Sequence, residues 1–265
     1  MMWTRRHRPP TMLCDYIRFF SERAGELGNH ALSAPLPVRV DQLIEFYFKD
    51  RYKVSRYGGP AAAAPEMAIV GPQRRSGTLL HLSGSLDVFT IHFQPGGLNA
   101  LFGVASSDLI DQGLEAQIVI GRCASELREN LMRAKDFAGR VDAAQRWVLS
   151  RMSSGKPVDM VARIAQILSA SGGAMPIAQL ARQTGLSDRQ FTRRFEYQTG
   201  LTPKIFARAV RFSAALETKS SAPERSWTEI AYEAGYADQS HLIRDSRQLG
   251  GAPPRSFHAD WSALR

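Results

Sequence analysis

The residues with the clearest chemical potential in this sequence are arginines that project from two expected helices. On a helical wheel, Arg189 and Arg193 point away from the apolar side chains of Phe191 and Phe195. Arg244 has the same outward direction in a second segment. A guanidinium group binds guanine through two parallel hydrogen bonds and also pairs with phosphate. The chemistry that this arrangement favours is recognition of nucleic acid.

Smaller polar side chains flank these arginines on the same helices. Leu242 and Ser246 point inward in the second helix, so the polar residues around them lie on its outer face and margins. The candidate DNA-contacting residues are Arg189, Gln190, Thr192, Arg193, Gln239, Ser240, His241 and Arg244. An outward arginine on a single helix is usually only solvated. The repeated setting of these two helices favours contact with DNA over that interpretation.

The two helices are preceded by segments that share one pattern. Residues 180–187 and 230–237 each contain an apolar residue, an alanine directly after it, and a glycine four residues after the alanine. The alanine lets two helices approach closely, and Gly185 and Gly235 can adopt the left-handed conformation that ends a helix. A helix, a short turn and a second helix form a helix-turn-helix. The sequence therefore predicts two such units.

Capping residues and a proline set the limits of the helices around each turn. Ser187 and Asp238 are good N-caps, and they predict recognition helices at 188–199 and 239–249. A connecting helix is expected at 203–218, with a proline at its first position. Its length of about 24 Å can hold two recognition helices one duplex turn, about 34 Å, apart.

The stretch from about 158 to 261 resembles the DNA-binding domain of AraC/XylS-type transcriptional regulators. The first unit fits the family pattern L-A-x-x-x-G-L-S-x-R-x-x-x-R-x-F and ends in G-L-T-P-x-x-F at Phe206. The second unit fits I-A-x-x-x-G-Y-x-D-Q-S-H-x-x-R and ends at Gly251 and Phe257. The resemblance implies seven helices, with one recognition helix per unit. It also implies that both recognition helices enter successive major grooves on one face of the duplex.

Three positions depart from this family pattern, all in the second unit. Leu242 and Ser246 stand where aromatic residues are usual, and Pro253 stands where a capping Ser or Thr is usual. A serine in place of a buried ring costs about 3 kcal/mol if nothing refills the space. We therefore expect the second unit to be the softer one. Ser246→Phe is expected to stabilise it by about 2–3 kcal/mol.

The first 120 residues follow a different pattern, of short runs rich in β-branched and aromatic residues. The predicted strands are Val38–Lys49, Tyr52–Tyr57, Met67–Gly71, Thr78–Leu82, Ser85–Phe93 and Gln117–Ile120. Helical spacing then predicts helices near 124–135 and 138–151. The predicted fold class is α+β, with a β-rich barrel or sandwich before an all-α DNA-binding domain. The expected domains are 1–152 and 158–265, joined by a linker at 153–157.

The N-terminal part resembles the cupin-like ligand-binding domains that precede such DNA-binding domains, at Val70–Pro72, Phe93–Gly97 and Leu101–Gly103. This resemblance implies a cupin-like barrel with short helices and a sensor role. The aromatic residues that either line an effector pocket or form plain core are Phe46, Phe48, Phe89 and Phe93. The helical stripe that either forms a dimer seam or packs on its own barrel is Leu127, Leu131, Val141 and Val148.

Composition limits the remaining classes of function. The 265 residues include 34 Lys and Arg against 25 Asp and Glu, and the net charge of +9 favours a nucleic-acid partner. The two cysteines, Cys14 and Cys123, exclude a disulfide framework or a cysteine-rich zinc site and fit a reducing cytosol. Met1–Pro10 lacks the apolar core of a secretory signal and is expected to be a solvated tail.

We therefore expect a cytoplasmic transcription regulator with no catalytic residues, metal or cofactor, and with no membrane contact. Double-stranded DNA and RNA polymerase are the expected partners, while a small-molecule effector and a homodimer stay open. The alternative is an N-terminal enzyme, metal site or reactive-cysteine site with an accessory DNA-binding domain. Against that alternative, His81 and His92 lack the spacing of a metal-binding cupin, so we expect ordinary strand histidines.

Overall fold

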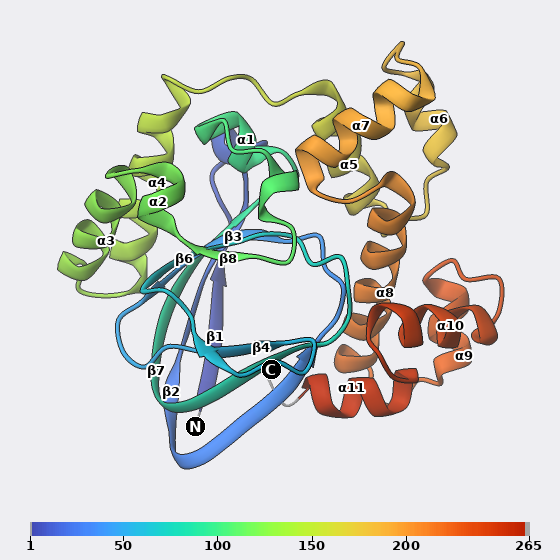
Figure 1. Cartoon of the computed structure of the whole chain (residues 1–265), viewed down its shortest axis with the longest axis horizontal. Coiled ribbons are helices and arrows are strands. Elements are labelled where there is room, and N and C mark those ends of the chain that lie inside the picture. Colours follow the sequence, from blue (N-terminus) through green and yellow to red (C-terminus); the bar gives the residue numbers. More distant parts are fainter. Residues whose placement is uncertain (1, 263–265) are drawn as a thin grey trace.

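The computed structural model describes residues 2–262, which form two lobes (Figure 1). One lobe is an antiparallel sheet with helices packed against it and the other is helical, which confirms the predicted α+β fold class. The strands are β1 (Met2–His7), β2 (Ile17–Leu36), β3 (Gln42–Tyr47), β4 (Lys53–Arg56), β5 (Ala62–Ala63), β6 (Met67–Val70), β7 (Thr78–Phe93) and β8 (Gly113–Glu115).

The sheet is built around one long ribbon, β2 with β7. Residues 84–93 of β7 pair with the first part of β2 and with β3, whereas residues 78–82 pair with the last part of β2 and with β4. A Cβ on Gly84 would lie 2.2 Å from Asp50 Oδ2, so glycine is required where the pairing changes. The main strand order β1-β2-β7-β3-β6-β8 ends at β1 and β8, and β4 with β5 branches from β7, so the sheet does not close within the described residues. The expected cupin-like barrel is therefore an open sheet.

Two expectations for the N-terminal lobe are wrong. Within Met1–Pro10, residues 2–7 are not a solvated tail but strand β1, paired along its whole length with β2. Gln117–Ile120 is not a strand, because it lies in helix α2 (Ala116–Ile120). A short apolar run has no periodicity that separates strand from helix.

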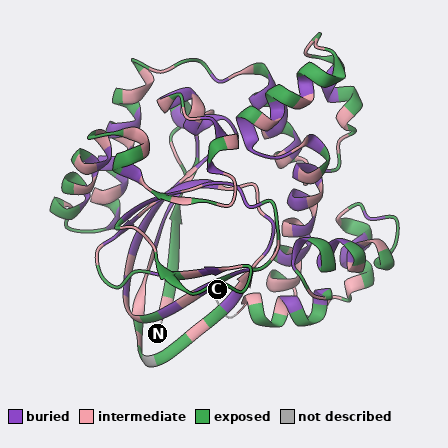
Figure 2. Ribbon diagram, viewed as in Figure 1, coloured by how far each residue is buried: buried purple, intermediate pink, exposed green. Residues whose placement is uncertain are grey.

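Short helices cover one face of this sheet. They are η1 (Thr11–Leu13), α1 (Gly97–Phe102), η2 (Ser106–Leu109), α2, α3 (Cys123–Arg133) and α4 (Phe137–Met152). Helices α3 and α4 confirm the helices predicted near 124–135 and 138–151. The predicted stripe of Leu127, Leu131, Val141 and Val148 is buried in the core between these helices and the sheet. Packing within its own lobe is therefore the correct alternative for this stripe. In β7, buried residues alternate with less buried ones over Thr78–Leu82, whereas β3 is buried almost throughout, and Figure 2 shows buried residues along the strands of the sheet.

The helical lobe contains the seven helices that the family resemblance implies, all within the described residues. They are α5 (Met160–Ala170), α6 (Ile177–Arg182), α7 (Asp188–Thr199), α8 (Pro203–Ser221), α9 (Trp227–Glu233), α10 (Gln239–Leu249) and α11 (Pro254–Ser262). The long helix α8 joins the α5–α7 group to the α9–α11 group (Figure 1). Each group has an apolar core of its own. No helix or strand lies between Met152 and Met160.

Candidate nucleic-acid interface

The first helix-turn-helix unit consists of α6, a turn and α7. Gly185 in the turn has φ 66°, which confirms the predicted left-handed conformation, and Gly200 after α7 also has a positive φ, of 75°. Ser187 forms a capping box with Gln190, in which each side chain bonds the other residue's backbone N–H. Local hydrogen bonds therefore determine where α7 begins and ends.

Three phenylalanines position α7 in this unit. Phe195 is fully buried, with its ring 5.7 Å from Phe191 and 5.3 Å from Phe206 between centroids. This packing directs the opposite face of α7 to solvent, where Arg189 and Arg193 are exposed. Neither arginine forms an ion pair or a side-chain hydrogen bond with another described residue. Both guanidinium groups are thus available to an external anion.

The second unit, α9 with α10, starts both of its helices in the same way. Ser226 and Glu229 form a capping box on α9, and the Ser226 backbone N–H holds the pKa of Glu229 below its ordinary value. Asp238 Oδ1 accepts the backbone N–H of His241 at 2.7 Å and caps α10. Gly235 in the turn has φ 77°.

The surroundings of Ser246 in this second core are not the empty space that the sequence pattern predicts. Ser246 is fully buried, and its hydroxyl donates to the Ala252 carbonyl at 2.7 Å. A Cβ on Gly250, one turn later, would lie 2.8 Å from the Phe257 ring, so the ring of α11 occupies the neighbouring space. The serine is therefore satisfied in a filled site, and Ser246→Phe has no cavity to enter.

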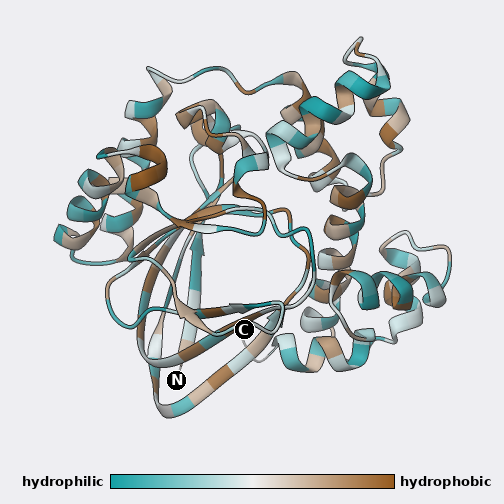
Figure 3. Ribbon diagram, viewed as in Figure 1, coloured by the Kyte–Doolittle hydropathy of each residue, from teal (hydrophilic) through white to brown (hydrophobic). Residues whose placement is uncertain are grey.

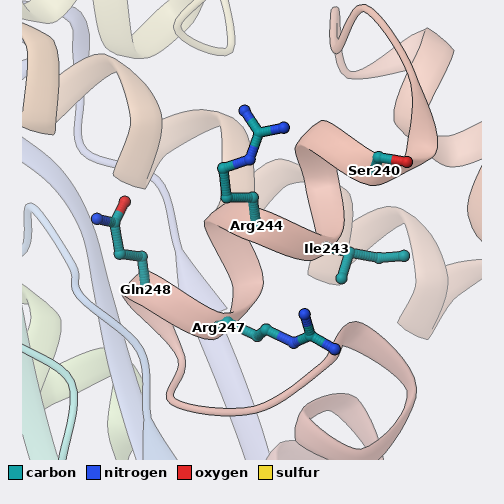
Figure 4. A pocket seen from close by; sticks show the side chains of 5 residues that line it. All are labelled: Ser240, Ile243, Arg244, Arg247 and Gln248. Atoms are coloured by element: carbon teal, nitrogen blue, oxygen red, sulfur yellow. The ribbon is translucent and has the colours of Figure 1, made fainter.

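A solvent-open groove runs along the outer face of α10. The side chains that line it are Ser240, Ile243, Arg244, Arg247 and Gln248 (Figure 4). Arg244 and Arg247 are exposed and form no ion pair with a described residue. Arg247 was missing from the predicted set, although its position three residues after Arg244 places both on one helical face. Hydrophilic residues mark the outer side of α10 in Figure 3.

The remaining predicted contact residues have more constrained side chains. Gln190 is held in the capping box, and Gln239 Oε1 accepts the Thr228 hydroxyl at 2.9 Å. The His241 ring packs edge-on against Tyr236, with centroids 5.3 Å apart. Thr192 is half-buried, whereas Ser240 is exposed. The four arginines and Ser240 therefore have exposed side chains that none of these contacts holds.

The N-terminal lobe contacts the last carbonyl groups of both recognition helices. Near the end of α7, the Gln198 carbonyl accepts the Ser106 hydroxyl at 2.7 Å and the Gln42 amide at 3.4 Å. At the end of α10, the Leu249 carbonyl accepts the Val38 backbone N–H at 2.7 Å. The last carbonyls of a helix have no partner within the helix. The N-terminal lobe supplies these partners and so fixes both helix ends.

The segment that supplies Val38 also enters the helical cores. Val38 is 1% exposed and belongs to the core of the second unit. Val40 packs against the cores of both units. One short connection between β2 and β3 therefore contacts the two groups of helices at once.

The predicted effector pocket does not form around the four phenylalanines. Phe46, Phe89 and Phe93 are buried in the core beneath α2–α4, and Phe48 packs against it. A cavity of about 250 Å³ lies on the opposite face of the sheet. Successive strand residues point to opposite faces, so Glu45 and Tyr47 line this cavity while Phe46 does not.

The strand histidines His81 and His92 are engaged in local contacts. His81 bonds Ser33 and Ser55, and His92 bonds Ser21 at 2.9 Å. Burial lowers the pKa of His92 to about 3. Burial also raises the pKa of the Cys123 thiol, the opposite of what a reactive thiolate needs. No group of three potential metal ligands occurs within residues 2–262.

Comparisons with known proteins cover both lobes. A family model described as "Helix-turn-helix domain" matches residues 180–260, and one described as "Domain of unknown function (DUF6597)" matches residues 5–115. No curated protein matches the chain.

Two solved structures of ToxT from Vibrio cholerae show the same fold. An apo lysine-to-alanine variant has 12% identity and a TM-score of 0.52, covering 96% of this chain and 100% of that chain. ToxT bound to (E)-4-(8-methylnaphthalen-1-yl)but-3-enoic acid has 10% identity and a TM-score of 0.51, covering 91% and 99%. Both lobes are therefore arranged as in a known whole-chain architecture. Among the described helices, none has the length and apolar character needed to cross a membrane.

Proposed function

We propose how this chain, a DNA-binding transcription regulator with an AraC-type helix-turn-helix domain at residues 180–260, contacts its operator. Helices α7 and α10 enter successive major grooves on one face of the duplex. Arg189 and Arg193 act from α7, and Arg244 and Arg247 act from α10. The observation that carries this proposal is that all four guanidinium groups are exposed and unpaired on two separately capped helices.

Helix α8 supports the required spacing of the two recognition helices. It has 19 residues, which at 1.5 Å per residue give a rod of about 28 Å. Successive major grooves on one face of a duplex are about 34 Å apart. A rod of this length, with one recognition helix beyond each end, suits that separation.

The other polar residues of the two helices have supporting roles in this proposal. Ser240 and Thr192 contact base edges or phosphates beside the arginines. Gln190, Gln239 and His241 lie at the rim, because their side chains are held by Ser187, Thr228 and Tyr236. Capping and packing groups that are already bonded lose those bonds if they turn toward DNA.

The experiment is a binding titration of full-length protein with selected operator DNA. Arg193→Ala should weaken specific binding by about 1–3 kcal/mol and relax the preference at one base position. Arg146→Ala, at an exposed residue of α4, is the control for the change in net charge. Equal weakening for all DNA sequences would reassign Arg193 to a phosphate, and no weakening would remove α7 from the interface.

The wider role follows from this contact with DNA. We place the regulator in the cytoplasm with RNA polymerase as its second partner and without enzymatic activity of its own. Residues 1–152 form the sensor domain, residues 158–265 bind DNA, and residues 153–157 link the two domains. The ToxT structure with a bound butenoic acid supports a small-molecule effector for the sensor. A homodimer would make use of the exposed faces of α2–α4.

A further inference from the structure

The cavity of the N-terminal lobe contains polar groups that have no partner in the protein. It lies among β3, β4, β6 and β7 and has a volume of about 250 Å³. Three of its lining side chains carry a buried donor atom without a hydrogen bond: Arg39 Nε, Gln73 Nε2 and Thr78 Oγ1. Gln73 is 5% exposed and Thr78 is 3% exposed. A buried donor without a partner costs about 1–3 kcal/mol, which a bound acceptor would recover.

Backbone pairing brings together the segments that carry these three donors. Arg39 and Gln73 are opposite each other in an antiparallel bridge, so their side chains leave the backbone on the same face. Thr78 pairs with Leu36, three residues before Arg39. The guanidinium of Arg39 forms no ion pair with a described residue. Arg56 is opposite Thr78 on β4, also lines the cavity and forms no ion pair with a described residue. These side chains therefore offer two positive charges and two neutral donors to an acceptor group.

The acidic groups of the cavity are already in use. Glu45 Oε2 accepts the Tyr47 hydroxyl at 2.5 Å, and burial raises the pKa of Glu45. Asp111 Oδ1 accepts the Arg74 backbone N–H at 2.8 Å. A cationic ligand would therefore compete with existing bonds, whereas an anionic ligand meets donors that have none.

The rest of the cavity wall consists of apolar side chains, several of them small. Its side chains include Leu36, Val54, Val70 and Leu80, and Ala62–Ala64 lies along one side. A volume of 250 Å³ equals the liquid volume of roughly eight water molecules, so it accommodates a molecule of about eight to ten non-hydrogen atoms.

We infer that this cavity binds a small organic monoanion, a carboxylate on a compact apolar body, through Arg39, Gln73 and Thr78. This inference rests on the proposed sensor role of the N-terminal lobe and is independent of the proposed DNA contacts. Arg39 directly follows Val38, whose backbone and side chain contact the second helix-turn-helix unit. The ligand would thus sit one residue away from the contact that holds α10.

The test is calorimetric titration of full-length protein, without DNA, with three probes of one shape: benzoate, benzamide and benzylamine. Benzoate should bind most tightly, benzamide roughly tenfold or more weakly, and benzylamine without measurable heat. Arg39→Gln should weaken benzoate binding roughly 10- to 100-fold, and Thr78→Val, which keeps the side-chain shape, by a smaller factor. Arg75→Gln makes the same charge change at an exposed residue outside the cavity and should leave binding within about twofold.

Four outcomes would overturn the inference: equal binding of benzoate and benzamide, tightest binding of benzylamine, equal effects of Arg39→Gln and Arg75→Gln, or no binding of any probe. Circular dichroism of each variant checks that it is folded, and Thr78→Val provides a test if Arg39→Gln is not. Operator affinity, measured by fluorescence anisotropy without a probe, separates this inference from the DNA-binding proposal. If the wild-type protein binds operator DNA but does not bind benzoate, the ligand site alone is contradicted.

Discussion

The two helix-turn-helix units begin their recognition helices alike but complete their cores differently. The first unit packs Phe191 and Phe195 against Phe206, all from the helical lobe. The second unit has a serine at the position equivalent to Phe195, and Val38 of the N-terminal lobe joins its core. The Ala252 carbonyl and the Phe257 ring close the serine site from within the helical lobe, whereas Val38 brings the N-terminal lobe into the same core. The difference indicates that the N-terminal lobe is part of the second unit's structure.

Ser246→Phe is the substitution with the largest expected effect on the stability of the second core. Family pattern alone predicts a gain in stability, but the filled site around Ser246 predicts a loss of about 2–4 kcal/mol from overpacking and the lost bond to Ala252. Chemical denaturation measures the change. Ser246→Ala, which loses only the hydrogen bond, should cost about 1 kcal/mol. A stabilised Ser246→Phe variant would show that the second core does contain free space.

The opposite predictions for Ser246→Phe show which features of the fold a sequence pattern does not determine. Capping residues and turn glycines act within a few positions of the chain, so Ser187, Asp238 and Gly235 could be assigned before the structure. The Ser246 site could not, because the groups that fill it come from the end of α10, from the loop after it and from α11. The contact of Val38 with α10 joins residues more than 200 positions apart and leaves no periodic signal.

In the N-terminal lobe, too, features that depend on distant contacts could not be predicted from the sequence pattern. The helices at 124–151 were predictable from their apolar spacing, but β1 was not, since only its pairing with β2 makes it a strand. The phenylalanines of β3 and β7 lie in one core, which is the plain-core alternative of the sequence analysis. The position of α3 and α4 determines which face of the sheet holds a cavity. The alternation of side chains along a strand does not determine where these helices pack.

Acid is expected to weaken the N-terminal lobe through His92. Burial lowers the pKa of His92 from about 6.5 to about 3, so the folded state favours the neutral ring. Stability from this group is complete above pH 6.5 and is lost as the pH falls toward 3. At pH 5 the loss is about 2 kcal/mol.

Denaturant titrations at pH 7.5 and pH 5 measure this loss. His92→Gln keeps a partner for Ser21 and should reduce the difference between the two pH values by about 2 kcal/mol. His30→Gln changes an exposed histidine of the same lobe and is the control. An unchanged pH dependence in His92→Gln would show that the ring is charged in the folded protein.

Val38→Ala is expected to lower stability by a smaller amount and to separate the two units. Removal of two buried methyl groups should destabilise the second unit by about 1–2 kcal/mol and leave the first unit unchanged. Hydrogen exchange should accelerate at the amides of α10 but not of α7. Val161→Ala, in the core of the first unit, should give the reverse pattern. Equal acceleration in both helices would mean that the units open together.

Selection of operator DNA from a random pool tests most directly whether both units recognise bases. It is performed with full-length wild type, Arg193→Ala and Arg244→Ala. We expect two conserved segments about one duplex turn apart. Arg193→Ala should relax the base preference in one segment and Arg244→Ala that in the other. A single conserved segment, or loss of preference in the same segment for both variants, would contradict recognition by α7 and α10 together.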